Sequence, residues 1–205
     1  MVALAQAATN PLSRHYMAGD GEEVFFDVEK ILSHEDSGPT ATRYLAEQMS
    51  RIKECVRWVQ KTYGAGTHTF VFETDDVRTD EDPAFIVIAG GHYLLLGTFR
   101  VSVRAEVTIT KDDYGNEGSA SMLATLQIGD YYDFDLDSGK HGGLASDAQM
   151  ARMALIGMAT PFFTWGASNY RRHSWSLDDT SPVPESDVER PKGTWNPRPG
   201  HLDEL

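Results

Sequence analysis

The sequence predicts an α+β domain in which helices flank an antiparallel sheet. Residues 99–109 alternate apolar and polar side chains, which is the period of a strand with one buried and one wet face. Residues 42–62 repeat apolar side chains every three to five positions, which is typical of an amphipathic helix. Neither 99–109 nor the partner strand expected at 119–128 is a continuous apolar run, so antiparallel pairing is favoured over a buried parallel sheet.

The other expected elements are short and are separated by runs of Gly, Pro, Asp and Ser. In chain order they are a strand at 24–28, a polar loop at 33–41, a strand at 68–73, an acidic loop at 75–82, a buried apolar run at 85–89, a hairpin loop at 111–118 and a helix opened by the capping box at 146–149. From Trp175 onward five of the nine prolines follow, so we expect a domain over 1–173 and a flexible, acidic, Pro-rich tail over 174–205.

Composition limits the classes of function. The 205 residues are 40 % hydrophobic, which suffices for one domain core. A net charge of −13 argues against nucleic-acid binding, because phosphate contacts draw on clustered Lys and Arg. The single cysteine, Cys55, excludes an internal disulfide and a Cys-rich zinc site. Because it lies on the amphipathic helix beside Val56, we expect a buried thiol.

No stretch of the sequence is apolar for long enough to cross a bilayer, and the first residues lack the basic and apolar regions of a secretory signal. We therefore expect synthesis in the cytoplasm without a signal peptide.

The segment 129–141 has the composition of a chemical site. Four carboxylates fall within eight residues and are followed by Lys140 and His141; the four are Asp130, Asp133, Asp135 and Asp137. Oxygen-rich clusters of this kind suit a hard divalent cation such as Mg²⁺ or Ca²⁺.

Two interpretations of this segment remain open. The acids belong to a polar edge strand and serve solubility alone, or they form a carboxylate–Tyr–His site for hydrolysis at a phosphorus or acyl centre. In the second case one Asp acts as nucleophile or general base, and His141 acts as acid or orienting group.

Three short motifs resemble, in the same order, those of the catalytic half of colicin M-like bacteriocins, and the resemblance covers roughly residues 10–160. The motifs are His15-Tyr16-x-x-Gly19-x-Gly21-x-Glu23, Gly97-Thr98-Phe99-x-Val101-Ser102 and Asp130-x-Tyr132-Asp133-Phe134. His141 and a helix that contains Arg152 follow the third motif.

The resemblance implies an open, curved, half-barrel-like antiparallel sheet with flanking helices. It also implies an antibacterial toxin that hydrolyses lipid II between the undecaprenyl chain and the pyrophosphate and so blocks peptidoglycan synthesis. The catalytic residues that it implies are Asp130, Tyr132, Asp133 and His141. The divalent cation, Mg²⁺ or Ca²⁺, would be held by Asp130, Asp133 and Asp135.

Gly142 stands where the family has an arginine, and we expect Lys140 and Arg152 to contact the substrate phosphates instead. The basic face of the 42–62 helix is a solvated face that nearby acids neutralise, or else it contacts an anionic surface. In the second case this face, or Arg171-Arg172-His173, would touch an anionic lipid surface. As partners we expect lipid II in the target membrane, a cognate immunity protein, and a secretion system or fused carrier that delivers the effector to the periplasm of a target cell.

Two other functions stay open at the level of sequence. The missing arginine and the longer loop after Asp133 are compatible with a non-enzymatic interaction module or an inactive relative. The same scaffold also suits a hydrolase of another phosphate or lipid substrate.

Overall fold

The computed structural model describes residues 16, 21–25, 28–33, 38–75, 77–78, 100–112, 117–132, 141–142 and 145–188. The strands are β1 (Val24–Phe25), β2 (Gly66–Glu73), β3 (Val77–Arg78), β4 (Arg100–Lys111), β5 (Gly118–Tyr132), β6 (His141–Gly142), β7 (Ala145–Ser146), β8 (Phe162–Ala167) and β9 (Arg171–Ser176). The helices are α3 (Val28–Ser33), α4 (Gly38–Val59) and α6 (Asp147–Leu155), with 3-10 turns η1 (Gln60–Thr62) and η2 (Glu185–Asp187).

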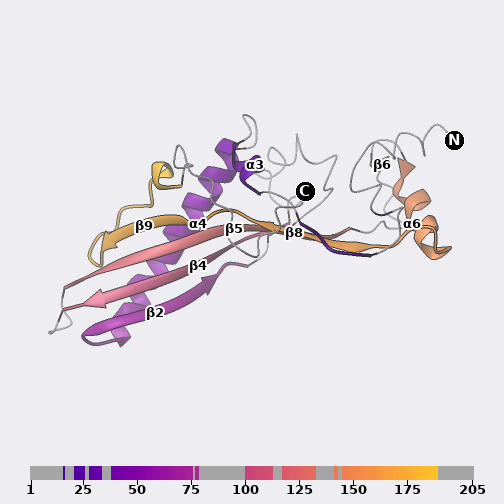
Figure 1. Ribbon diagram of the computed structural model, residues 1–205. Helices are drawn as coiled ribbons and strands as arrows, with labels where there is room; N and C mark the ends of the chain where they lie inside the picture. The colour runs from indigo at the N-terminus through magenta and orange to yellow at the C-terminus, as the bar shows by residue number, and fades with distance from the viewer. Residues whose placement is uncertain are drawn as a thin grey trace.

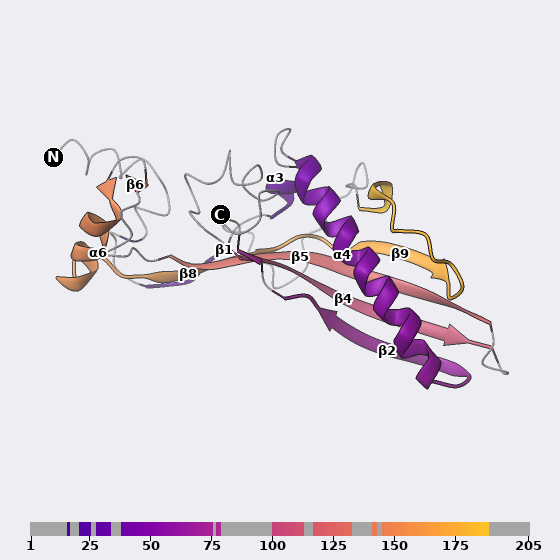
Figure 2. The same cartoon turned by 180° about the vertical axis from the view of Figure 1, so that it is seen from behind.

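The predicted α+β class with an open, curved, largely antiparallel sheet is confirmed. The main sheet has the order β1-β8-β5-β4-β2, with β3 also on β4 and β9 also on β5. Among the described strands only β1 and β8 pair in parallel. Figures 1 and 2 show that α4 covers the wide part of this sheet, whereas β5, β8 and β1 extend beyond the helix toward α6.

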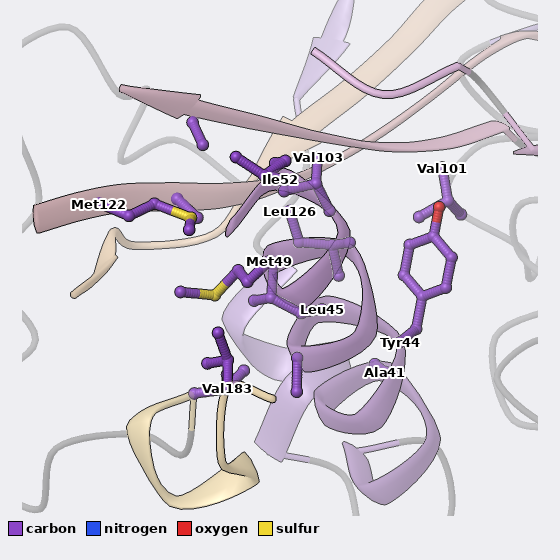
Figure 3. Packing of buried hydrophobic residues seen from close by; sticks show 14 of the residues in the cluster. Ala41, Tyr44, Leu45, Met49, Ile52, Val101, Val103, Met122, Leu126 and Val183 are labelled. Carbon is purple, nitrogen blue, oxygen red and sulfur yellow. The ribbon is translucent and has the colours of Figure 1, made fainter. Parts of the chain in front are cut away.

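The core lies between α4 and one face of β4 and β5. The alternation predicted for 99–109 is confirmed, because Val101, Val103, Ala105, Val107 and Ile109 are all buried. Leu45, Met49 and Ile52 point from α4 toward the sheet (Figure 3) and are also buried. Burying a side chain of this size contributes about 1.5–3 kcal/mol, so this interface fixes the position of the helix on the sheet.

The helix differs from its prediction at its start and at its cysteine. It begins at Gly38 rather than after a loop that ends at 41, because a proline such as Pro39 is tolerated in the first helical turn. The thiol of Cys55 is exposed, so the expectation of a buried thiol is wrong. One residue is about 100° of helix rotation, which turns Cys55 away from the core that its neighbour Val56 enters.

A β-bulge joins β8 and β9 into one bent strand beside β5. Ala167 pairs with Gln127 and Arg171 pairs with Ala124, so three residues, 168–170, face two on β5. Ser168 fixes the bulge: its N–H donates to the Leu126 carbonyl at 2.8 Å, and its Oγ accepts the Leu126 N–H at 2.9 Å.

The packed domain continues past residue 173, where we expected it to end. Trp175, Leu177, Val183 and Val188 are buried in the core. The Val183 N–H donates to the Ser50 Oγ of α4 at 2.9 Å. Proline content suggested a flexible tail, but apolar residues between the prolines hold this segment on the domain, and residues 189–205 lie outside the described residues.

Candidate functional site

The candidate site lies where β5, β8 and β1 run side by side. Asp130 pairs with Thr164 and Tyr132 pairs with Phe162 across the β5–β8 ladder. On the other side of β8, Val24 of β1 also pairs with Thr164. The strand after the first motif and the strand that holds the third motif are thus joined through one residue of β8.

The first motif packs against the segment that leads into β8. Tyr16 is fully buried, and its carbonyl accepts the Thr160 N–H at 2.9 Å. Gly21 has φ +70°, a left-handed conformation that favours glycine, and a Cβ there would come within 3.0 Å of the Thr160 Cγ2. The glycine therefore permits both the turn and its close approach to Thr160.

The second motif enters β4 next to the third. Val101 pairs with Ile128 and Ser102 pairs with Gln127, two and three residues before Asp130. Gly97, Thr98 and Phe99 lie outside the described residues. In the described part of the chain, segments of all three motifs converge on one end of the sheet although they are distant in the sequence.

The predicted site residues are only partly within the described chain. Asp130 and Tyr132 are among the last three residues of β5, and His141 is the first residue of β6. Arg152 is exposed on α6. Figures 1 and 2 show β6 and α6 together beyond the end of β8. The remaining predicted site residues, Asp133, Asp135 and Lys140, lie outside the described residues.

The donor set is compatible with the expected cation in its chemistry, since Asp130, Asp133 and Asp135 offer only carboxylate oxygens, which are the ligands that Mg²⁺ and Ca²⁺ prefer. Within the described residues no three His, Cys, Asp or Glu side chains lie close enough together to hold a metal ion. Two of the three predicted ligands are not among those residues.

An apolar tip closes this end of the molecule. It consists of Leu155, Ile156 and Met158, which are 71, 69 and 59 % exposed. Helix α6 ends in a Schellman motif, with Gly157 at φ +73°. The Met158 N–H donates to the Met153 carbonyl at 2.8 Å, and the Gly157 N–H donates to the Ala154 carbonyl at 3.0 Å. The backbone of the tip is therefore held in place while its side chains face solvent.

An aromatic pair lies between the tip and the wider sheet. Tyr131 of β5 and Phe163 of β8 pair across the ladder, with ring centroids 4.7 Å apart, and both rings are exposed. The exposed apolar surface thus begins directly beside Asp130 and Tyr132 in the chain.

Three of the basic side chains expected at a lipid surface are buried instead. Arg171 forms an ion pair with Glu29 at 2.9 Å, and His173 binds Asp187 at 2.6 Å. Lys53, on the expected basic face of the helix, is 3 % exposed and donates to Asp179 at 2.8 Å. The expectation for Arg171-Arg172-His173 is therefore wrong, because alternation along β9 leaves only Arg172 of the three exposed.

Strand β8, on which the site depends, was not predicted from the sequence. Its signal is short: Phe162-Phe163-Thr164-Trp165 are good strand formers, and their burial alternates along the strand. Pro161 precedes this strand and the bulge at 168–170 follows it, so the alternating pattern lasts for only six residues.

Comparison with known proteins yields no relatives: no protein-family model matches the chain, and no curated protein or solved structure matches it. None of the described helices combines the length and the apolar character needed to cross a membrane.

Proposed function

We propose that the protein is an antibacterial effector that hydrolyses lipid II with the help of a divalent cation. The main support is the convergence of the three motifs. The β1–β8–β5 ladder joins the region of Gly21 to Asp130 and Tyr132, and β4 pairs Val101 and Ser102 with Ile128 and Gln127 earlier on the same strand as Asp130. A catalytic site assembled from distant parts of the chain requires such a convergence.

In the proposed reaction, water attacks and the bond between the undecaprenyl chain and the pyrophosphate breaks. Asp133 takes the proton of a water that attacks phosphorus, or it attacks phosphorus itself and water then hydrolyses the resulting acyl phosphate. In either case His141 gives a proton to the undecaprenyl oxygen, which leaves as undecaprenol. Asp130, Asp133 and Asp135 would hold Mg²⁺ or Ca²⁺, which supplies charge stabilisation for the phosphate oxygens. Lys140 and Arg152 bind the phosphates as cations, and Tyr132 orients the acidic groups.

The apolar tip supports a substrate that lies in a membrane. Leu155, Ile156 and Met158 would enter the boundary of the bilayer, while Tyr131 and Phe163 meet the headgroup level, which is the order of side chains found at membrane interfaces. The contact is peripheral. As an effector of the target periplasm, the protein would further require delivery machinery and an immunity protein in the cell that produces it.

The test is incubation of the purified protein with lipid II, with and without Mg²⁺ or Ca²⁺, followed by chromatographic separation of the products. We expect free undecaprenol only when the metal is present, and we expect Asp133→Ala to lose this product while it keeps its circular dichroism spectrum. Glu117→Ala is the matched control, because Glu117 is an exposed carboxylate at the opposite end of β5.

Intact lipid II under all conditions would overturn the proposal and leave an interaction module as the better explanation. Release of undecaprenol by Asp133→Ala at the wild-type rate would show that the assigned site is wrong. Cleavage of another phosphate or lipid in place of lipid II would identify a different substrate for the same scaffold.

A further inference from the structure

The sheet has a groove on the face that α4 leaves open. It has a volume of about 260 Å³ and crosses β4, β5, β8 and the bulge, with Val71 of β2 at its margin. We call it the open-face groove; the residues that matter for its chemistry are Arg104, Glu106, Gln127, Trp165, Ala167 and Tyr170. These residues are separate from the predicted catalytic and metal-binding residues.

Small and buried residues of the bulge and of β5 belong to the lining of the groove. Thr125 is 5 % exposed, and its Oγ1 donates to the Ser168 carbonyl at 2.7 Å. Because the Ser168 Oγ also accepts the Leu126 N–H, this part of the lining is fixed by buried hydrogen bonds and is part of the fold.

One wall of the groove is an aromatic ring in a fixed orientation. The Trp165 Nε1–H donates to the Glu23 Oε2 at 3.4 Å, and the Phe25 ring stands at 74° to the indole with 4.5 Å between centroids. Trp165 remains 42 % exposed. A ring that is held in this way and still exposed can stack on a ligand at little further cost in side-chain entropy.

The polar wall has complementary charges. Arg104 and Glu106 are exposed, and among the described residues the side chains of these two and of Gln127 form no hydrogen bond or ion pair. The guanidinium only donates, the carboxylate only accepts, and the amide does both. Because the two charges cancel, the groove favours a neutral ligand with many hydroxyl groups over a polyanion.

Other ligand classes fit less well. The backbone groups under the groove already pair within the sheet, so a peptide has no free edge there for strand addition. Nucleic acid would need a basic surface, and the chain has a net charge of −13. The volume is below the roughly 300–1,000 Å³ of pockets that enclose a whole drug-sized molecule, so the groove suits a segment of a longer chain.

We propose that the open-face groove binds a short segment of a neutral oligosaccharide. The apolar C–H face of a sugar ring lies on Trp165, and its hydroxyl groups bond to Arg104, Glu106 and Gln127. This is a binding site in addition to the proposed catalytic site. It does not depend on hydrolysis of lipid II, and no covalent step takes place in it.

The test is calorimetric and fluorescence titration of the full chain with triacetylchitotriose and with cellotriose, in the absence of metal and lipid. We expect saturable binding of at least one sugar with a change in tryptophan emission. Trp165→Ala should weaken binding at least tenfold, and Arg104→Gln should weaken it to a smaller extent. Trp58→Ala, which removes a tryptophan on α4 that is 67 % exposed and lies outside the groove, should leave the affinity unchanged.

Ala167→Phe is the second variant, because it fills the groove and removes no polar group. It should abolish binding with an unchanged circular dichroism spectrum, and it keeps the test decisive if Trp165→Ala does not fold. The proposal is overturned if neither sugar binds the wild-type protein, if both groove variants bind as the wild type does, or if a sulfated oligosaccharide binds more tightly than the neutral ones. Loss of lipid II cleavage together with normal sugar binding would contradict only the proposed function.

Discussion

Lys53 shows how a single buried charge is accommodated in this fold. Its ammonium group donates to the Asp179 carboxylate at 2.8 Å and to the Ser181 carbonyl at 2.8 Å, and it lies 5.6 Å from the Trp175 ring centroid. Burying an ammonium group without partners costs much free energy. These partners therefore explain why α4 tolerates a lysine on the face that packs against the core.

The same contacts predict a pH dependence of stability. The hydrogen bond from Lys53, together with those from the Ser181 hydroxyl and backbone N–H, holds the pKa of Asp179 well below its usual value. A carboxyl group whose folded pKa is depressed stabilises the fold above its unfolded pKa of about 3.9, and this contribution is lost as the pH falls toward the folded value.

We therefore expect Asp179→Asn to be less stable than the wild type at pH 7 and to approach wild-type stability below about pH 4. Urea unfolding at pH 7, 5 and 3 measures the difference. Glu185→Gln, which changes an exposed carboxylate of η2, is the control and should show no such trend. A difference between Asp179→Asn and wild type that is the same at pH 7 and pH 3 would contradict the assignment.

At the scale of the element, the end of α6 is unusual. In a Schellman motif the residue after the glycine commonly packs on the last helical turn. Here that residue, Met158, is 59 % exposed although both backbone hydrogen bonds of the motif are formed. The geometry of the motif is kept while the side chain stays available to a partner outside the chain.

Ile156→Glu should weaken binding of the protein to phosphatidylcholine vesicles by about tenfold or more. The reason is that burying an isoleucine contributes about 1.5–3 kcal/mol, and each 1.4 kcal/mol is a factor of ten. Co-sedimentation with the vesicles measures the effect. Val71→Glu, which places the same change on the exposed face of β2, is the control. Equal binding by Ile156→Glu and wild type would exclude the tip as the contact.

Elements with long periodic patterns could be predicted from the sequence, and elements with short patterns could not. Helix 38–59 and the pair β4–β5 were found because their apolar spacing continues over many residues. Strands β8 and β9 were not found because a bulge separates two runs of six residues. Asp130 and Tyr132 were placed just beyond the strand expected at 119–128, whereas β5 continues to Tyr132. Their partners Thr164 and Phe162 depend on a long-range pairing that no local pattern records.

At the scale of the whole molecule, one buried ion pair joins three distant parts of the chain. Arg171 of β9 binds both carboxylate oxygens of Glu29 in α3, at 2.9 and 3.1 Å, and its Nε donates to the Val188 carbonyl at 2.6 Å. Both side chains of the pair are nearly inaccessible. The Asn169 N–H of the bulge also donates to Glu29, at 2.7 Å.

Glu29→Gln should lower the free energy of unfolding by roughly 3–5 kcal/mol, because it leaves the Arg171 guanidinium buried without a counter-charge. Guanidinium chloride denaturation measures the loss. Glu29→Leu combined with Arg171→Met removes both charges and should be less destabilised than the sum of the two single changes. Additive effects of the two substitutions would show that the pair is not coupled.

The parallel pairing of β1 with β8 has a consequence for the order in which the chain folds. Val24 is synthesised long before its partner Thr164, so this contact has a very high sequence separation. Contacts of this kind form slowly, and during translation they cannot form until the later strand has left the ribosome. A partly synthesised chain that has not yet reached β8 therefore lacks the assembled end of the sheet on which Asp130 and Tyr132 lie.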